Sequence, residues 1–203
     1  MNNKYKVSNI RIAIICCSES EDLDVVIPYD IWRRSGIIVD TISSEKKKSI
    51  FLQCGTKITC SEQIDIVNLD QYNAIYIPGG KGYERLFDEK NDRVTKKVIK
   101  FSADEEKKWV FASAEASLYL KKINVLGTKK VTTYPGYEKE IGDNYSSENI
   151  VVSKNFITFK SAFFAFDFAL LVVEKLLNKQ IATNVAHDLL SVSYTHLTLP
   201  TIA

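Results

Sequence analysis

The sequence predicts one α/β domain in which a mostly parallel sheet carries helices on both faces. Two observations support this prediction. Short apolar runs rich in β-branched residues alternate along the chain with segments whose apolar residues follow helical spacing. The 203 residues also suit one domain, because they allow a sizeable core and contain neither a linker nor an internal repeat.

The first expected strand and helix give the clearest signals. Residues 11–17 (RIAIICC) form an apolar, β-branched run, as expected of a strand that is buried on both faces. Ser18, followed three residues later by Glu21, is a capping-box signal for the start of a helix. Gly36 is expected to end this helix.

The rest of the chain repeats the same alternation. Apolar runs with β-branched or aromatic residues predict strands, apolar residues three and four apart predict helices, and polar or glycine-containing breaks predict hairpin turns. Further strands are expected at 39–42, 74–77, 109–112 and 131–133, and hairpins at 51–60 and 151–159. Further helices are expected at 83–87, 93–103, 116–122, 166–177 and 180–190.

Residues 191–203 match none of these patterns. They resemble a translated sequencing-adapter sequence, so we expect a disordered or non-native tail after a domain that covers 1–190, and we assign no role to His196. The polar N-terminus carries no signal-peptide pattern, which makes the cytoplasm the expected location.

Composition argues against several classes of partner. Lysine and arginine total 27 against 25 aspartate and glutamate, and the basic residues are scattered, so we expect no nucleic-acid partner. No apolar stretch approaches the roughly 20 residues of a membrane-spanning helix, so no membrane partner is expected. We also expect no metal or cofactor, because the cysteines form no C-x-x-C pair and histidines are scarce. Cys16 and Cys17 are interpreted as small buried hydrophobes, whereas Cys54 or Cys60 could be a reactive thiol.

Three stretches resemble one known family. They are residues 24–37 (DVVIPYDIWRRSGI), 74–80 (AIYIPGG) and 130–135 (KVTTYP). Together they are similar to motifs of the ThiJ/PfpI superfamily (class I glutamine amidotransferase-like proteins), in the branch of the Parkinson-associated deglycase. The resemblance implies a flavodoxin-like three-layer sandwich, which is usually a homodimer. Members are glyoxalases, protein deglycases, proteases, chaperones or oxidative sensors, so the fold does not select one activity.

The resemblance also implies positions for the site. The family's helix acid corresponds to Asp24, and Pro28, which lacks an N–H, deprives the Asp24 carbonyl of its usual helical partner. Active relatives place a cysteine nucleophile on a strained turn between strand and helix, and here Glu115 is assigned to that position. The family's histidine is replaced by Tyr134, a weak base at neutral pH. A simpler interpretation is that Asp24 and Glu115 are acids at helix N-termini, where the helix dipole favours them.

Other positions are expected to bind rather than react. Gly79 and Gly80 correspond to an anion-binding turn, and Ala116 and Arg34 are further candidate binding positions. Arg34 and its neighbour Arg33 could equally be surface arginines or lie at a dimer interface. The bulky pair Phe163 and Phe164 could either fill the pocket or belong to the core.

These assignments favour a protein that has lost cysteine-dependent glyoxalase or deglycase chemistry and acts as a binding, sensing or scaffolding homodimer. In one version of this hypothesis, the Glu115 carboxylate imitates an oxidised cysteine and bonds to the Gly79–Gly80 turn. The alternative is an enzyme that acts on small carbonyl metabolites through an Asp24/Glu115 carboxylate pair, by glyoxalase, deglycase or hydratase-like chemistry.

Overall fold

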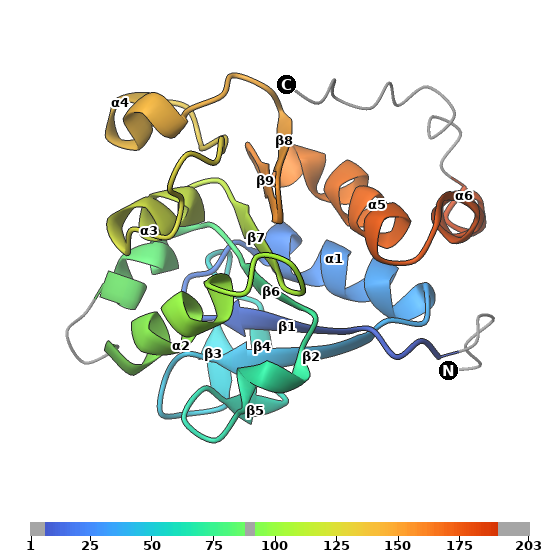
Figure 1. The fold of residues 1–203 in the computed structure, drawn as a ribbon. Coiled ribbons are helices and arrows are strands. Elements are labelled where there is room, and N and C mark those ends of the chain that lie inside the picture. Colours follow the sequence, from blue (N-terminus) through green and yellow to red (C-terminus); the bar gives the residue numbers. More distant parts are fainter. Residues whose placement is uncertain (1–6, 88–91, 191–203) are drawn as a thin grey trace.

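Seven strands form one sheet in the order β5-β2-β1-β6-β7-β9-β8, and a separate hairpin contains β3 and β4 (Figure 1). This is a computed structural model, which describes residues 7–87 and 92–190. The strands are β1 (Arg11–Cys16), β2 (Ile38–Ser43), β3 (Ser49–Phe51), β4 (Lys57–Thr59), β5 (Glu62–Gln63), β6 (Ala74–Ile77), β7 (Trp109–Ser113), β8 (Ile150–Ser153) and β9 (Phe156–Phe159). All neighbours in the large sheet are parallel except β8 and β9, which pair antiparallel.

Helices cover both faces of the sheet. They are α1 (Asp22–Arg34), η1 (Leu69–Gln71), η2 (Lys81–Phe87), α2 (Asp92–Ser102), α3 (Ala116–Lys122), α4 (Glu138–Ile141), η4 (Gly142–Asn144), η5 (Ala162–Phe164), α5 (Ala165–Leu176) and α6 (Lys179–Asp188). Figure 1 shows α1, α5 and α6 on one side of the sheet and α2 and α3 on the other. The predicted three-layer, flavodoxin-like α/β sandwich is confirmed.

Each face of the sheet has its own apolar core, because successive side chains of a strand point to opposite faces. Ile12 and Ile14 of β1 pack with α1, α5 and α6, whereas Ala13 and Ile15 pack with α2 and α3. The central strands are therefore apolar on both sides. Within 7–87 and 92–190, no helix is both long and apolar enough to cross a bilayer.

Two local predictions are wrong. The capping box does not form: α1 begins at Asp22, the Glu21 side chain makes no cap, and the Glu21 amide donates instead to the Gly79 carbonyl at 2.9 Å. Residues 131–133 contribute only an isolated bridge from Val131 to Tyr145. Both sides of β7 are already paired with β6 and β9, so this segment cannot pair beside β7. Its Thr132 amide instead bonds to the Thr158 hydroxyl of β9.

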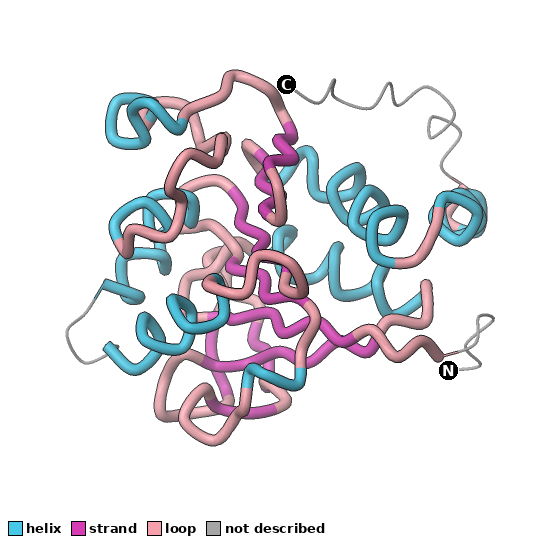
Figure 2. Tube along the Cα trace, in the orientation of Figure 1, coloured by secondary structure: helices cyan, strands magenta, loops and turns pink. Residues whose placement is uncertain are grey.

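The expected tail at 191–203 lies outside the described residues, and so does His196. The remaining expected elements are present with small shifts at their ends. The elements that the sequence did not predict are short, such as β5 and α4. Figure 2 shows the strands at the centre of the molecule with helices around them. Because β1, β6 and β7 are parallel, the loops that follow them all leave the sheet at its carboxyl end, where the candidate site lies.

Candidate active site

The site lies at the carboxyl ends of β1, β6 and β7, the usual ligand position in an open parallel sheet. The loop after β1 and the Pro78-Gly79-Gly80 turn after β6 are in backbone contact. Gly80 has φ +94°, and a Cβ added there would lie 2.5 Å from the Glu21 amide nitrogen. Glycine is therefore required at this position by both its conformation and the available space.

Asp24 is the buried acid of this site. Its side chain is fully buried, and its Oδ2 accepts hydrogen bonds from the Ser113 hydroxyl at 2.6 Å and from the Gly79 amide at 3.3 Å. Its backbone carbonyl, which Pro28 leaves without a helical partner, accepts from the Tyr76 hydroxyl at 3.0 Å. The predicted effect of the proline on the Asp24 carbonyl is confirmed, and the buried Tyr76 hydroxyl satisfies the free carbonyl.

The surroundings of Asp24 favour its protonated form. Burial, together with the negative charges of Glu21 and Glu115, raises the pKa of the Asp24 carboxyl to about 7, against the opposing hydrogen bonds from Ser113 and Gly79. Its second oxygen, Oδ1, is buried and has no hydrogen-bond partner among the described residues. Asp24 therefore combines an unsatisfied oxygen with a proton that can be exchanged near neutral pH.

Contrary to the prediction from the sequence, Glu115 does not occupy the strained position of the sharp turn between β7 and α3. The residue in the left-handed region is Ala114, with φ +45°, whereas Glu115 has ordinary helical angles of φ −64° and ψ −21°. The assignment of Glu115 to the strained position is thus wrong by one residue. The strand β7 continues to Ser113, one residue past its predicted end, so the bend falls on alanine.

Glu115 nevertheless reaches the glycine turn. Its Oε2 accepts a hydrogen bond from the Gly80 amide at 3.1 Å. The expected contact between this carboxylate and the Gly79–Gly80 turn is therefore confirmed, although it is made from the N-cap of α3 and not from the bend itself.

These groups border a cavity of about 370 Å³. Its lining residues are Glu21, Asp24, Gln53, Gly80, Lys81, Ala114, Glu115, Tyr134, Ser161, Ala162 and Phe163. Tyr134 is 46% exposed and Phe163 is 85% exposed, so both rings lie at the mouth. Phe164 packs against the core instead. Neither phenylalanine fills the cavity.

Two predicted binding residues lie elsewhere. Arg34 is in the last turn of α1, opposite the end that carries Asp24, and forms an exposed ion pair with Asp30 at 2.6 Å. Ala116 is completely buried in the core on the α3 face. Neither residue lines the cavity, so the structure does not bring either of them to this site.

The cysteines also lie outside the cavity lining. Cys17 is buried against the Gly82 carbonyl and the Ser20 hydroxyl, and burial raises the pKa of its thiol to about 11. Cys16 and Cys60 are buried as well, while Cys54 is exposed. The charges of Asp22 and Glu21 raise the pKa of the Cys54 thiol, which disfavours the reactive thiolate. The prediction that Cys16 and Cys17 are buried is confirmed.

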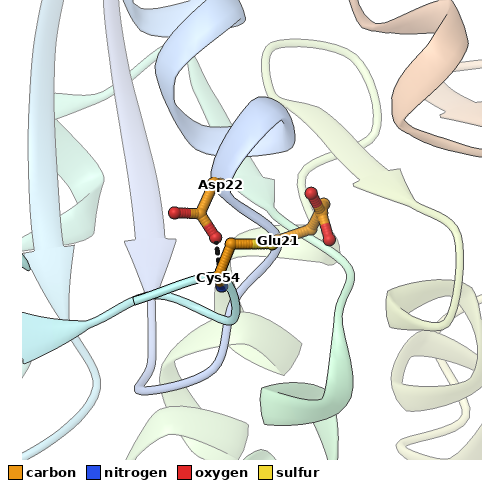
Figure 3. A group of neighbouring side chains, drawn as sticks. All are labelled: Glu21, Asp22 and Cys54. Atoms are coloured by element: carbon orange, nitrogen blue, oxygen red, sulfur yellow. Dashed lines mark hydrogen bonds between the residues drawn. The ribbon is translucent and has the colours of Figure 1, made fainter. Parts of the chain in front are cut away.

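Cys54 also belongs to a cluster with Glu21 and Asp22, of which only Cys54 is exposed. One potential ligand atom of each residue lies within 4.8 Å of the others. Figure 3 shows that Asp22 is already engaged, since its carboxylate accepts from the Cys54 amide at 2.7 Å. A small acidic cluster of this kind does not by itself identify a metal site.

Sequence reasoning missed several residues of the site. The sequence gives no sign that Ser113 is the partner of Asp24, and Ser113 is fully buried and fully hydrogen-bonded. Glu21 could have been found, because it precedes Asp24 by three residues and residues three apart share a helix face. Gln53 gave no sequence signal, since the β3–β4 loop brings it to the cavity from a separate hairpin.

Comparison with known proteins agrees with this architecture. The chain is 28% identical over 188 residues to the Parkinson disease protein 7 homolog of Danio rerio, covering 89% of this chain and 96% of that protein. It is 26% identical over 153 residues to a deglycase of Pyrococcus abyssi, covering 73% and 89%. The structure of oxidized Toxoplasma gondii DJ-1 superposes with a TM-score of 0.84 at 26% identity, covering 90% of this chain and 99% of that one. The model of the DJ-1/PfpI family matches residues 10–175, and the chain belongs to that family.

Proposed function

We propose that this protein is a DJ-1/PfpI-family homodimer without thiol-dependent chemistry, which uses its cavity to bind a small molecule. The observation that carries the proposal is Ala114. This residue has the left-handed backbone of a nucleophile elbow, the kind of turn that exposes a reactive side chain, but a methyl group cannot act as a nucleophile.

The unsatisfied Asp24 oxygen supports this proposal. The resemblance to the family implies that the corresponding acid touches the sulfur of the nucleophile in active relatives. Here Oδ1 of Asp24 has no hydrogen-bond partner among the described residues, and Ala114 lines the same cavity. If the nucleophilic cysteine is lost and the helix acid is retained, the acid loses the partner of one oxygen, and that oxygen is left buried and unpaired.

The glycine turn supports it further. The Gly80 amide, which would stabilise a developing negative charge, already donates to the Glu115 carboxylate. An internal anion thus occupies the donor that acyl or carbonyl chemistry would use. The histidine position holds Tyr134, which lies at the exposed mouth of the cavity.

Exposed apolar residues on α1 and the β3–β4 hairpin support the homodimer. Leu23, Val26 and Tyr29 of α1 are 50%, 47% and 38% exposed, and Phe51 of β3 is 56% exposed. Between these elements lies a cavity of about 230 Å³ lined partly by Val26, Tyr29 and Ile58. Contiguous apolar surface of this kind usually marks an interface.

The proposal is tested by trying to restore activity. Wild-type protein should convert methylglyoxal to lactate no faster than buffer. The variant Ala114→Cys/Glu115→Ala/Tyr134→His should gain turnover, because it places a thiol beside Asp24 and frees the Gly80 amide. The matched control Glu115→Cys/Tyr134→His should gain none, since its thiol is one residue past the bend. Turnover by the wild type, or by the control alone, would contradict the proposal.

A second candidate is acid–base chemistry by Asp24 and Glu115 on a small carbonyl compound. The pKa of Asp24, about 7, favours this candidate, because such a carboxyl can donate and accept protons at neutral pH. In that case the wild type would convert methylglyoxal, and both Asp24→Asn and Glu115→Gln would abolish the conversion.

A further inference from the structure

The residues that line the cavity include no cysteine, and most of the charged ones are acidic. Glu21, Asp24 and Glu115 contribute three carboxyl groups, and Lys81 is the single basic residue among the described residues that line it. An anionic ligand would face a net negative wall and would compete with Glu115 for the Gly80 amide.

One oxygen of Asp24 is left without a hydrogen-bond partner among the described residues. Oδ2 is saturated by Ser113 and Gly79, whereas Oδ1 is buried, has no partner among the described residues, and belongs to a residue that lines the cavity. Leaving a buried polar oxygen unpaired is costly, so a donor supplied by a ligand would be bound favourably.

The mouth of the cavity adds an aromatic component. The exposed rings of Tyr134 and Phe163 border the same space as the acidic groups. Aromatic faces attract organic cations, and carboxylates bind ammonium and guanidinium groups through charge-assisted hydrogen bonds. A volume of about 370 Å³ suits a small metabolite.

We propose that this cavity binds a small organic cation whose ammonium or guanidinium group donates to Asp24 Oδ1, between Glu21 and Glu115 and beneath the Tyr134 and Phe163 rings. This inference rests on the proposed binding function and adds the class of ligand to it.

Binding of such a ligand must displace a proton near neutral pH. The groups that face Asp24 are Ser113 of β7, Gly79 of the glycine turn, Tyr76 of β6, Glu21 before α1, and Glu115 before α3. None of these supplies a positive charge, so burial keeps the pKa of Asp24 at about 7 until a cation enters. The cation favours the ionised carboxylate, and a proton leaves to solvent.

The test is calorimetric titration of the full chain with n-butylammonium, n-butylguanidinium, n-butanol, butyramide and butyrate, in buffers of different ionisation enthalpy near pH 6.5. At least one cation should bind, with proton release, and the neutral and anionic analogues should not. Asp24→Asn should weaken cation binding about tenfold or more and remove the proton release. Glu115→Gln should weaken it less. The matched control Asp30→Asn, on the same helix but outside the cavity, should change neither.

The inference is overturned if neither cation binds at millimolar concentration, if butyrate or butyramide binds as well as the cations, or if cation binding is unchanged by Asp24→Asn. These results are independent of methylglyoxal turnover. If the protein binds no cation and also converts no methylglyoxal, the proposed loss of thiol chemistry stands and only the cationic ligand is refuted.

Discussion

Replacing Asp24 with asparagine is expected to change how the stability of this protein depends on pH. The asparagine amide keeps an oxygen that can accept from the Ser113 hydroxyl and the Gly79 amide, but it cannot ionise. The substitution therefore isolates the cost of ionising a buried carboxyl group.

The size of the effect follows from the shift in pKa. The carboxyl group of Asp24 has a pKa of about 7 in the folded protein, against an ordinary value of 3.8. Between these values the folded state holds a proton that the unfolded chain has released, so stability falls as pH rises through this window and levels off above pH 7. At about 1.4 kcal/mol per pH unit, the penalty approaches roughly 4 kcal/mol, of which about 2.5 kcal/mol accumulates between about pH 5 and pH 8.

Urea unfolding of the wild type and Asp24→Asn, followed by the fluorescence of Trp32 and Trp109, gives the free energy of unfolding at each pH. The free energy of unfolding of the variant, relative to that of the wild type, should rise by about 2.5 kcal/mol from about pH 5 to pH 8. The contributions of the other titrating groups cancel in this comparison, because both proteins contain them. Asp30→Asn, which removes only an exposed ion pair, should show a nearly constant difference.

A difference for Asp24→Asn that stays constant across this range would refute the reasoning. It would mean that Asp24 is ionised in the folded state over the whole range and that burial does not control its protonation. A difference that grows in favour of the wild type would refute it equally.

Two further predictions concern the bend and the dimer. Ala114→Gly should change the free energy of unfolding by less than about 0.5 kcal/mol, since relief of the left-handed strain offsets the lost methyl group. The control Ala112→Gly, within β7, should lower the free energy of unfolding by about 1–2 kcal/mol. Equal losses for the two variants in urea unfolding would place the bend elsewhere. Wild-type protein should be a dimer in light scattering coupled to size-exclusion chromatography, and Val26→Glu should convert it to a monomer. The control Ile99→Glu, on α2, should remain a dimer. A monomeric wild type would exclude the proposed interface.

The sequence alone determined the layers of this protein and the acid of its site. Continuous apolar runs alternate along the chain with segments whose apolar residues are three and four apart, and this alternation predicts an α/β sandwich. The two patterns differ because a central strand is buried on both faces, whereas a helix is buried on one. The Pro28 ring removes a hydrogen bond from Asp24 by covalent structure, which is also a local property. Such features require no knowledge of distant contacts.

Tertiary structure decided which residue occupies the bend. The last pair of β7 joins Ser113 to Phe159, and the Ala114 amide donates to the Phe159 carbonyl at 2.8 Å. The end of β7 is thus set by a strand that is distant in sequence, and a shift of one residue moves the left-handed turn from Glu115 to Ala114. The burial of Asp24, its pairing with Ser113 and the acidic lining of the cavity arise in the same way, from contacts between segments that meet only in the folded chain.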